Sequence, residues 1–253
     1  MRLRLRCVVP ALLAGLGFIA PALPCLGAEN TVVKASPAEI AAEKAHRTKL
    51  ENALAVDPKN LTCRIQLGRV LSDLGAFGDK NASDAAVELL KTLHTEQPKD
   101  AEILAFYGNA CTIYAQYSSI FTKLSWVHDG FNYMDAAEKA SPDDIDIRVT
   151  RAINSAQVPG FLGREKLARD DFAWLLKRIQ STPKDFSPDL LRTIYYFNGK
   201  FLLEHNDAAA VQILAQAAAI PPPEGDTLTE KIADSLKTAR EKFAPSSPIA
   251  KVP

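Results

Sequence analysis

The stretch AHRTKLENALAVDP, residues 45–58, and the stretch LTCRIQLGRVL, residues 61–71, decide the fold of this chain. Apolar and small residues recur at helical spacing in the first stretch until Pro58, which cannot continue a helix. The same spacing resumes at Leu61 and brings Leu67-Gly68 onto one face. The pattern predicts two helices joined by a short turn.

The proline that ends this first helix belongs to a series. Its members fall 38 to 44 residues apart, and an Ala- and Leu-rich helical stretch precedes most of them: Pro58, Pro98, Pro142, Pro183 and Pro221. A fixed period of this length is typical of a helix-hairpin repeat in which a proline closes each unit. Because a repeat array provides a surface, the period favours binding over catalysis.

The remaining helices follow from the same signals. Caps, breaks and apolar spacing predict helices over 37–56, 61–74, 83–96, 101–117, 121–140, 145–156, 164–180, 187–204, 208–220 and 226–243. No segment alternates with a period of two over the length of a strand. We therefore expect an all-α protein.

The chain resembles the tetratricopeptide repeat (TPR) family. The resemblance rests on the large-small pairs Leu67-Gly68 and Tyr107-Gly108, on small residues such as Ala86 and Ala137 in the following helix, and on the closing prolines. It implies an α-solenoid of about four to five stacked hairpins over residues 37–222, preceded by a linker at 29–36. A capping helix at 223–243 and a disordered tail at 244–253 would follow.

The repeats diverge from the family pattern. Arg151-Ala152 stands where a large-small pair is expected, and extra residues occur at 76–81, 116–126 and 158–163. In the last of these segments, we expect Phe161 and Leu162 to pack back on the helices; an exposed apolar finger for a partner is the alternative.

The N-terminus has the layout of a secretory signal peptide. Arg2, Arg4 and Arg6 precede an apolar run, and cleavage is expected after Ala28. An uncleaved anchor is the alternative. We expect an exported protein, periplasmic or secreted, with no membrane span after cleavage.

Charge argues against nucleic acid as a partner. Removal of the three leader arginines from a chain with 30 Lys and Arg and 30 Asp and Glu leaves a net charge of −3. Such a chain offers no basic stripe to neutralise phosphates.

Two cysteines remain after cleavage, Cys63 and Cys111. Their places in equivalent helices of neighbouring repeats differ by about eight residues, or about 12 Å along the helix axis. A disulfide requires Cα atoms within about 7 Å. We expect two buried free thiols.

The chain offers no recognisable catalytic, metal or cofactor site. The four histidines left after cleavage show no metal-ligand spacing, and we expect them at the surface or at helix ends. Asp143-Asp144 is interpreted as a helix N-terminus, where negative charge is favourable. The sequence predicts a non-enzymatic protein without metal or cofactor.

The resemblance also implies a binding face. In the family, the first helices of the hairpins line the concave side and hold a peptide of a partner. Here that face would comprise Ile65, Arg69, Ser72, Asp73, Ala105, Asn109, Thr112, Val149 and Gln157. We expect an unidentified protein or peptide partner. The alternative is a periplasmic repeat protein that binds a small apolar molecule in the aromatic cluster of residues 106–133. The sequence leaves the oligomeric state open.

Overall fold

The computed structural model describes residues 35–222, 226 and 228–244. They form two compact units, 35–181 and 182–244. Both units consist of α-helices and short 3-10 turns, and no strand occurs among the described residues. The all-α prediction is confirmed. The predicted signal peptide, residues 1–28, lies outside the described residues, as do most of the 29–36 linker and the 244–253 tail. The predicted domain boundaries stay a prediction.

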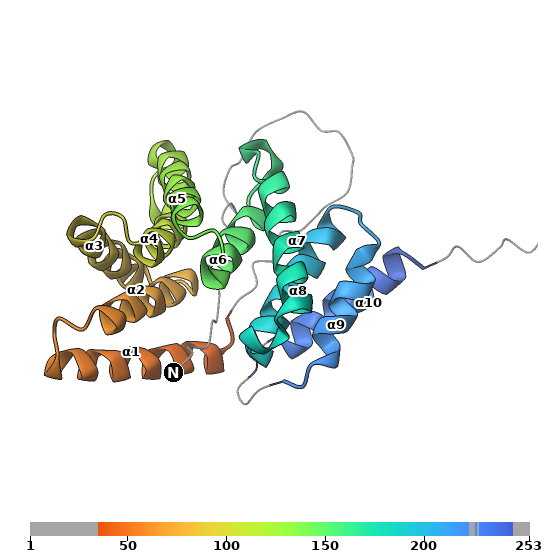
Figure 1. Cartoon of the computed structure of the whole chain (residues 1–253), viewed down its shortest axis with the longest axis horizontal. Helices are drawn as coiled ribbons and strands as arrows, with labels where there is room; N and C mark the ends of the chain where they lie inside the picture. Colours follow the sequence, from red (N-terminus) through yellow and green to blue (C-terminus); the bar gives the residue numbers. More distant parts are fainter. Residues whose placement is uncertain (1–34, 223–225, 227, 245–253) are drawn as a thin grey trace, which may run out of the picture. The chain divides into compact units, whose positions relative to one another are not determined.

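Successive helices pack as hairpins (Figure 1). The first unit contains α1 (Pro37–Val56), α2 (Leu61–Ala76), α3 (Lys80–Glu96), α4 (Ala101–Tyr114), α5 (Ile120–Ala140), α6 (Ile145–Ala156) and α7 (Glu165–Ser181). The second contains α8 (Pro188–Glu204), α9 (Ala209–Ala219) and α10 (Thr229–Lys242). The pairs α2/α3, α4/α5, α6/α7 and α8/α9 are the hairpins, and α1 packs on α2.

The turns before α2, α4 and α6 are copies of one another. The residue before each proline lies outside the helical region, with φ of −131° at Asp57, −138° at Gln97 and −139° at Ser141, because the proline ring disfavours a helical residue before it. Three residues later, the side-chain oxygen of an Asn or Asp caps the next helix by accepting a 3.0 Å hydrogen bond; Asn60, for example, accepts from the Cys63 amide. The periodic prolines therefore set a periodic turn.

Glycines let the two helices of a hairpin approach closely, as the sequence predicts. A Cβ on Gly68 would lie 2.6 Å from Cγ of Leu90, and one on Gly199 would lie 2.6 Å from Cγ of Leu214. The closest crossing is between α4 and α5, where a Cβ on Gly108 would lie 2.5 Å from the carbonyl oxygen of Gly130. Ordinary side chains would force these helices apart.

Among the helix boundaries that differ from the prediction, two are explained by hydrogen bonds of nearby side chains. Helix α3 begins at Lys80 rather than near Ser83, since Asp79 accepts a hydrogen bond from the Ala82 amide at 3.0 Å. Helix α4 ends at Tyr114 and continues as a 3-10 turn over Ala115–Tyr117. Gln116 and Tyr117 in this turn both donate to the carbonyl oxygen of Gly75.

The last helix is held by a buried arginine. Arg192 of α8 is 2% exposed and donates to the carbonyl oxygens of Ala217 and Ile220 at the end of α9. It also pairs with Asp226, which accepts from the Thr229 amide at the start of α10. Because α10 packs on α9, this helix covers the last hairpin as the predicted capping helix should.

Both cysteines are free, but only one is buried as predicted. Cys111 lies inside the α2–α4 core and Cys63 is half-buried near the start of α2. Burial raises the pKa of the Cys111 thiol to about 12. Cys111 is therefore protonated and unreactive at neutral pH.

Candidate functional site

The nine residues predicted to bind a partner lie on α2, α4 and α6 or directly after them. These are the first helices of three successive hairpins, and α4 contacts both α2 and α6. Alignment on Gly68, Gly108 and Ala152 places equivalent positions side by side, for example Ile65, Ala105 and Val149. We call the side of α2, α4 and α6 that carries these positions the first-helix face.

Most of the predicted residues are buried. Ile65, Ala105 and Val149 are at most 3% exposed and belong to the apolar core. Ser72 donates a 2.9 Å hydrogen bond to the Gly68 carbonyl within its own helix, and Asp73 is 4% exposed. These side chains support the face from within, and whether any contacts a partner stays a prediction.

Asn109 and Thr112 belong to a buried polar network that the sequence did not reveal. Asn154 of α6 donates to Asn109 at 3.0 Å and accepts from the Thr112 hydroxyl at 2.8 Å. Because both hydrogen bonds are buried and directional, they fix the register of α4 against α6. Asn154 is separated from them by 42 or more residues, so no local pattern could have indicated the pairing.

Arg69 also lies within the face. Its side chain is 6% exposed, and its guanidinium lies 5.7 Å from the ring centroid of Phe106 on α4. The remaining predicted residue, Gln157, is half-buried where α6 ends.

The part of the first-helix face that is open to solvent is formed by the first turns of its helices. Glu102 of α4 and Asp146 of α6 occupy equivalent positions, and both are exposed to solvent. Enough protein surrounds them for burial to raise the pKa of each carboxyl group. The negative charges of Asp100 and Asp144 raise the pKa of Glu102 further, whereas Arg69 opposes the shift for both carboxyls. Nothing in the sequence marks this pair beyond its 44-residue spacing.

The side-chain amide of Gln66 is buried on the same face of α2, one helical turn after Thr62. Gln66 is 6% exposed, and its Oε1 has no hydrogen-bond partner among the described residues. It shares one face of α2 with Thr62 and Arg69, at positions i, i+4 and i+7. A buried acceptor without a donor is unfavourable for the folded chain alone, so Gln66 is a candidate ligand contact.

Helices α5, α6 and α7 are joined by three arginines and three carboxylates. Arg151 donates to Asp171 through Nε and Nη2 at 2.8 Å and to Glu138 at 3.0 Å. Arg148 pairs with the same two carboxylates at 2.7 and 2.6 Å. Arg164 holds Asp135 at 2.7 and 2.8 Å. The network explains why Arg151 stands where the TPR pattern has a large residue. The partners of Arg151 are carboxylates on the two neighbouring helices, Glu138 on α5 and Asp171 on α7.

The rings of the aromatic cluster pack against one another. The Tyr107 and Tyr133 ring centroids lie 4.7 Å apart, as do those of Tyr114 and Trp126. His94 lies in the last turn of α3, as the prediction of a helix end has it, and its ring stacks 5.7 Å from the Tyr107 ring. These contacts supply core packing, and the apolar-ligand alternative gains no support from them.

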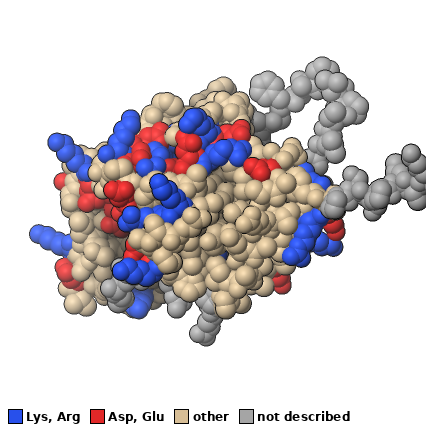
Figure 2. Space-filling model, turned by 45° about the vertical axis from the view of Figure 1, so that its right-hand side comes forward, with Lys and Arg blue, Asp and Glu red and all other residues tan. Residues whose placement is uncertain are grey.

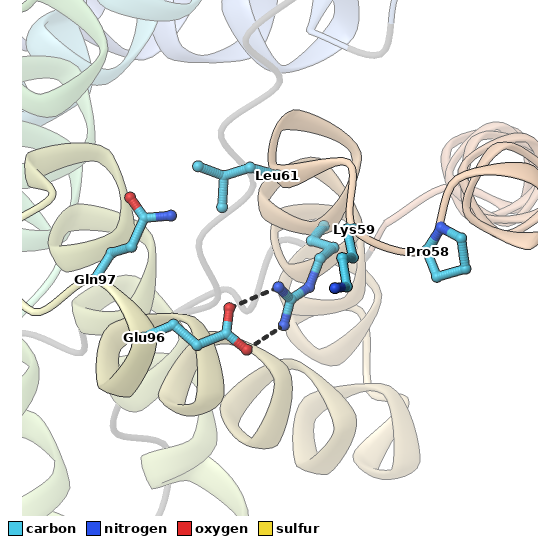
Figure 3. A pocket seen from close by; sticks show the side chains of 6 residues that line it. Pro58, Lys59, Leu61, Glu96 and Gln97 are labelled. Atoms are coloured by element: carbon cyan, nitrogen blue, oxygen red, sulfur yellow. Dashed lines mark hydrogen bonds and ion pairs between the residues drawn. The ribbon is translucent and has the colours of Figure 1, made fainter.

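One pocket of about 500 Å³ lies elsewhere, beside the turn that connects α1 to α2 (Figure 3). It is lined by Pro58, Lys59, Leu61, Arg64, Glu96 and Gln97. Arg64 donates two hydrogen bonds to Glu96, of 2.6 and 2.9 Å, which are the dashed lines at Glu96 in Figure 3. Its strongest donor is thus already paired, and the pocket forms no preorganised ligand site.

Some large apolar side chains reach solvent. Phe161 is 69% exposed, contrary to the prediction that it packs on the helices, while Leu162 packs against the α5 core as expected. At the start of α5, Phe121 is 92% and Ile120 55% exposed. Both sites lie in the segments that lengthen the repeats.

Two further kinds of site are absent from the described residues. In the part of the chain that the structure describes, no three His, Cys, Asp or Glu side chains are placed to hold a metal ion. No helix within 35–222 or 228–244 combines the length and apolarity needed to span a membrane. On the face shown in Figure 2, basic and acidic side chains lie interspersed.

The fold defines the class: an all-α, TPR-like array of helix hairpins. Among solved structures, the chain is similar to the crystal structure of TTC0263, a thermophilic TPR protein from Thermus thermophilus. The TM-score is 0.59 at 18% identity, over 78% of this chain and 92% of that one. No protein-family model and no curated protein matches the chain.

Proposed function

We propose that this chain is an exported scaffold that binds a peptide segment of a partner protein along the first-helix face. The observation that carries the proposal is the alignment of Glu102 with Asp146 at the open end of this face. The exposed carboxylates provide side chains that a partner can reach, and the buried residues behind them provide a rigid base.

The buried residues have a supporting role in this proposal. Arg69 and Asn109 engage other side chains, so their substitution would disturb the packing as well as any contact with a partner. Binding is better tested at exposed positions of the same helices, where a changed side chain leaves the core intact.

The test is site-specific photocrosslinking in the native host. A photoreactive amino acid replaces Thr62, Glu102 or Asp146 in turn, and replaces Lys91 on α3 as the matched exposed control. We expect the three first-helix positions to crosslink to one and the same protein and Lys91 not to. Equal crosslinking at Lys91, or none at the three positions, would contradict the proposal.

Export is a separate part of the proposal and rests on the N-terminal sequence. An arginine-rich start, an apolar run and Gly27-Ala28 before a polar stretch support processing by a signal peptidase. Intact-mass measurement of the chain recovered from the periplasm or medium should give a protein that begins at Glu29. Recovery of the unprocessed chain from the cytoplasm alone would refute export.

A further inference from the structure

We propose that the peptide bound by the first-helix face is basic, with Lys or Arg side chains that contact Glu102, Asp146 and the Gln66 amide. The inference deepens the proposed function and rests on it. It concerns the chemistry of the partner, which the fold alone leaves open.

The first argument is charge. Glu102 and Asp146 are exposed, and Asp100 and Asp144 cap the same two helices next to them. The opposing cation, Arg69, is 6% exposed and lies against the Phe106 ring. A docking segment therefore meets accessible negative charge, and complementarity favours a positively charged one.

The second argument is independent of charge. The Oε1 of Gln66 is a buried acceptor that no described residue satisfies. An ammonium, a guanidinium or a backbone N–H group would supply the missing donor. Carboxylates and this amide oxygen share one property: each accepts hydrogen bonds. The ligand must accordingly bring donors, and Lys and Arg side chains bring several each.

The raised carboxyl pKa values agree with this assignment. In the free protein, burial disfavours the ionised forms of Glu102 and Asp146. A bound cation would relieve that cost by pairing with them. Binding should hence strengthen as pH rises through the range in which these carboxyls ionise. The other groups near Glu102 that shape this range are Asp100, Asp144 and Arg69.

The experiment measures fluorescence anisotropy of three labelled peptides of equal length with the full chain. One alternates Lys with Ala, one Glu with Ala and one Ser with Ala. We expect only the Lys peptide to bind, and binding to be lost at high salt. In Glu102→Gln/Asp146→Asn, the affinity should fall about 5-fold or more, the effect of two partly screened charge pairs.

The matched control is Glu88→Gln/Asp129→Asn. It removes the same charge from exposed positions on α3 and α5 and should bind the Lys peptide like the wild type. If both double variants lose affinity equally, attraction is by net charge alone and the proposal is overturned. If the Ser or Glu peptide binds as well as the Lys peptide, it is likewise overturned.

A Gln66→Leu variant separates ligand contact from folding. Replacement of a buried amide whose oxygen has no donor by an apolar side chain of similar size should leave thermal stability unchanged or higher, while the affinity for the Lys peptide falls. Unchanged affinity in both Gln66→Leu and Glu102→Gln/Asp146→Asn would refute the assignment.

Failure of the inference and failure of the proposed function are distinguishable. Mass spectrometry of the photocrosslinked products identifies which segment of the partner meets positions 102 and 146. A crosslinked segment that lacks Lys and Arg would refute the basic peptide while the binding face stands. Absence of crosslinks at the face would refute both.

Discussion

Asp170 and Asp171 are neighbours in sequence with opposite environments, and their substitution tests how the hairpins are joined. Asp171 is 0% exposed and accepts three short hydrogen bonds, from Arg148 at 2.7 Å and from Arg151 at 2.8 and 2.8 Å. Asp170 pairs with Lys166 at 2.6 Å, but the two side chains are 55% and 84% exposed. Both substitutions to Asn remove one charge and keep the shape.

The expected loss of folding stability for each substitution follows from how deeply the side chain is buried. Removal of one partner of a buried, hydrogen-bonded ion pair leaves a charge uncompensated and costs about 3–5 kcal/mol. Arg151 keeps Glu138 as a partner at 3.0 Å, so we expect a cost at the low end, about 3 kcal/mol, for Asp171→Asn. An exposed pair such as Asp170 with Lys166 contributes about 0.5 kcal/mol or less.

Tryptophan fluorescence during urea unfolding measures the difference in stability between Asp171→Asn and Asp170→Asn. The chain contains two tryptophans, Trp126 on α5 and Trp174 on α7, so the signal reports on the unit formed by residues 35–181. Trp174 lies next to the network, with the Arg148 guanidinium 5.1 Å from its ring centroid. The two variants should share the slope of the wild type and differ in midpoint.

A double variant tests whether the loss of stability comes from the uncompensated buried charge. Arg151→Met/Asp171→Leu replaces the whole pair by apolar side chains of similar volume and should recover most of the stability that either single substitution removes. If Asp171→Asn costs no more than Asp170→Asn, the network does not join the hairpins and the reasoning fails.

Three further predictions concern the packing of other helices. Gly108→Ala should lower stability by about 1–3 kcal/mol because its methyl group would overlap the α5 backbone, whereas Gly160→Ala, with nothing within 4 Å, should be near neutral; thermal melts followed by tryptophan fluorescence compare them. Arg192→Met should free α10 at a cost of about 3 kcal/mol, seen as faster hydrogen exchange in α10 alone. Burial raises the pKa of Asp226, but hydrogen bonds from Thr229 and Arg192 outweigh it and lower the pKa overall. Its stabilising effect is therefore present above the ordinary pKa of about 4 and lost as pH falls below it, so exchange in α10 should accelerate in acid, and Asp226→Asn should abolish that acceleration.

The hairpin architecture was predictable because its signals are local. Prolines such as Pro58 and Pro98 stop helices by covalent geometry, and capping residues such as Asn60 act within three positions. Glycines at the crossings, Gly68 and Gly108, belong to the same short-range pattern. These features specify helices, turns and their order without knowledge of distant residues.

The exposed residues of the proposed binding face could not be chosen from the sequence. The sequence analysis placed the proposed face on α2, α4 and α6. Several of the predicted positions, such as Ile65 and Val149, are buried in the structure. Burial of a helix position depends on how closely the neighbouring hairpin packs, and that distance is set by side chains far away in the sequence. The exposed pair Glu102 and Asp146 emerges only when the helices are aligned.

By itself, then, the sequence determined an all-α array of proline-closed hairpins, because helix spacing, caps and breaks depend on neighbouring residues. Only the tertiary structure decided which polar residues are buried and which are accessible. It paired Asn109 with Asn154 and Arg151 with Asp171, and it left Glu102 and Asp146 open to solvent. The physical reason is that desolvation and charge pairing depend on which helices meet in space, and a repeat period fixes the order of the helices but not the side chains that meet between them.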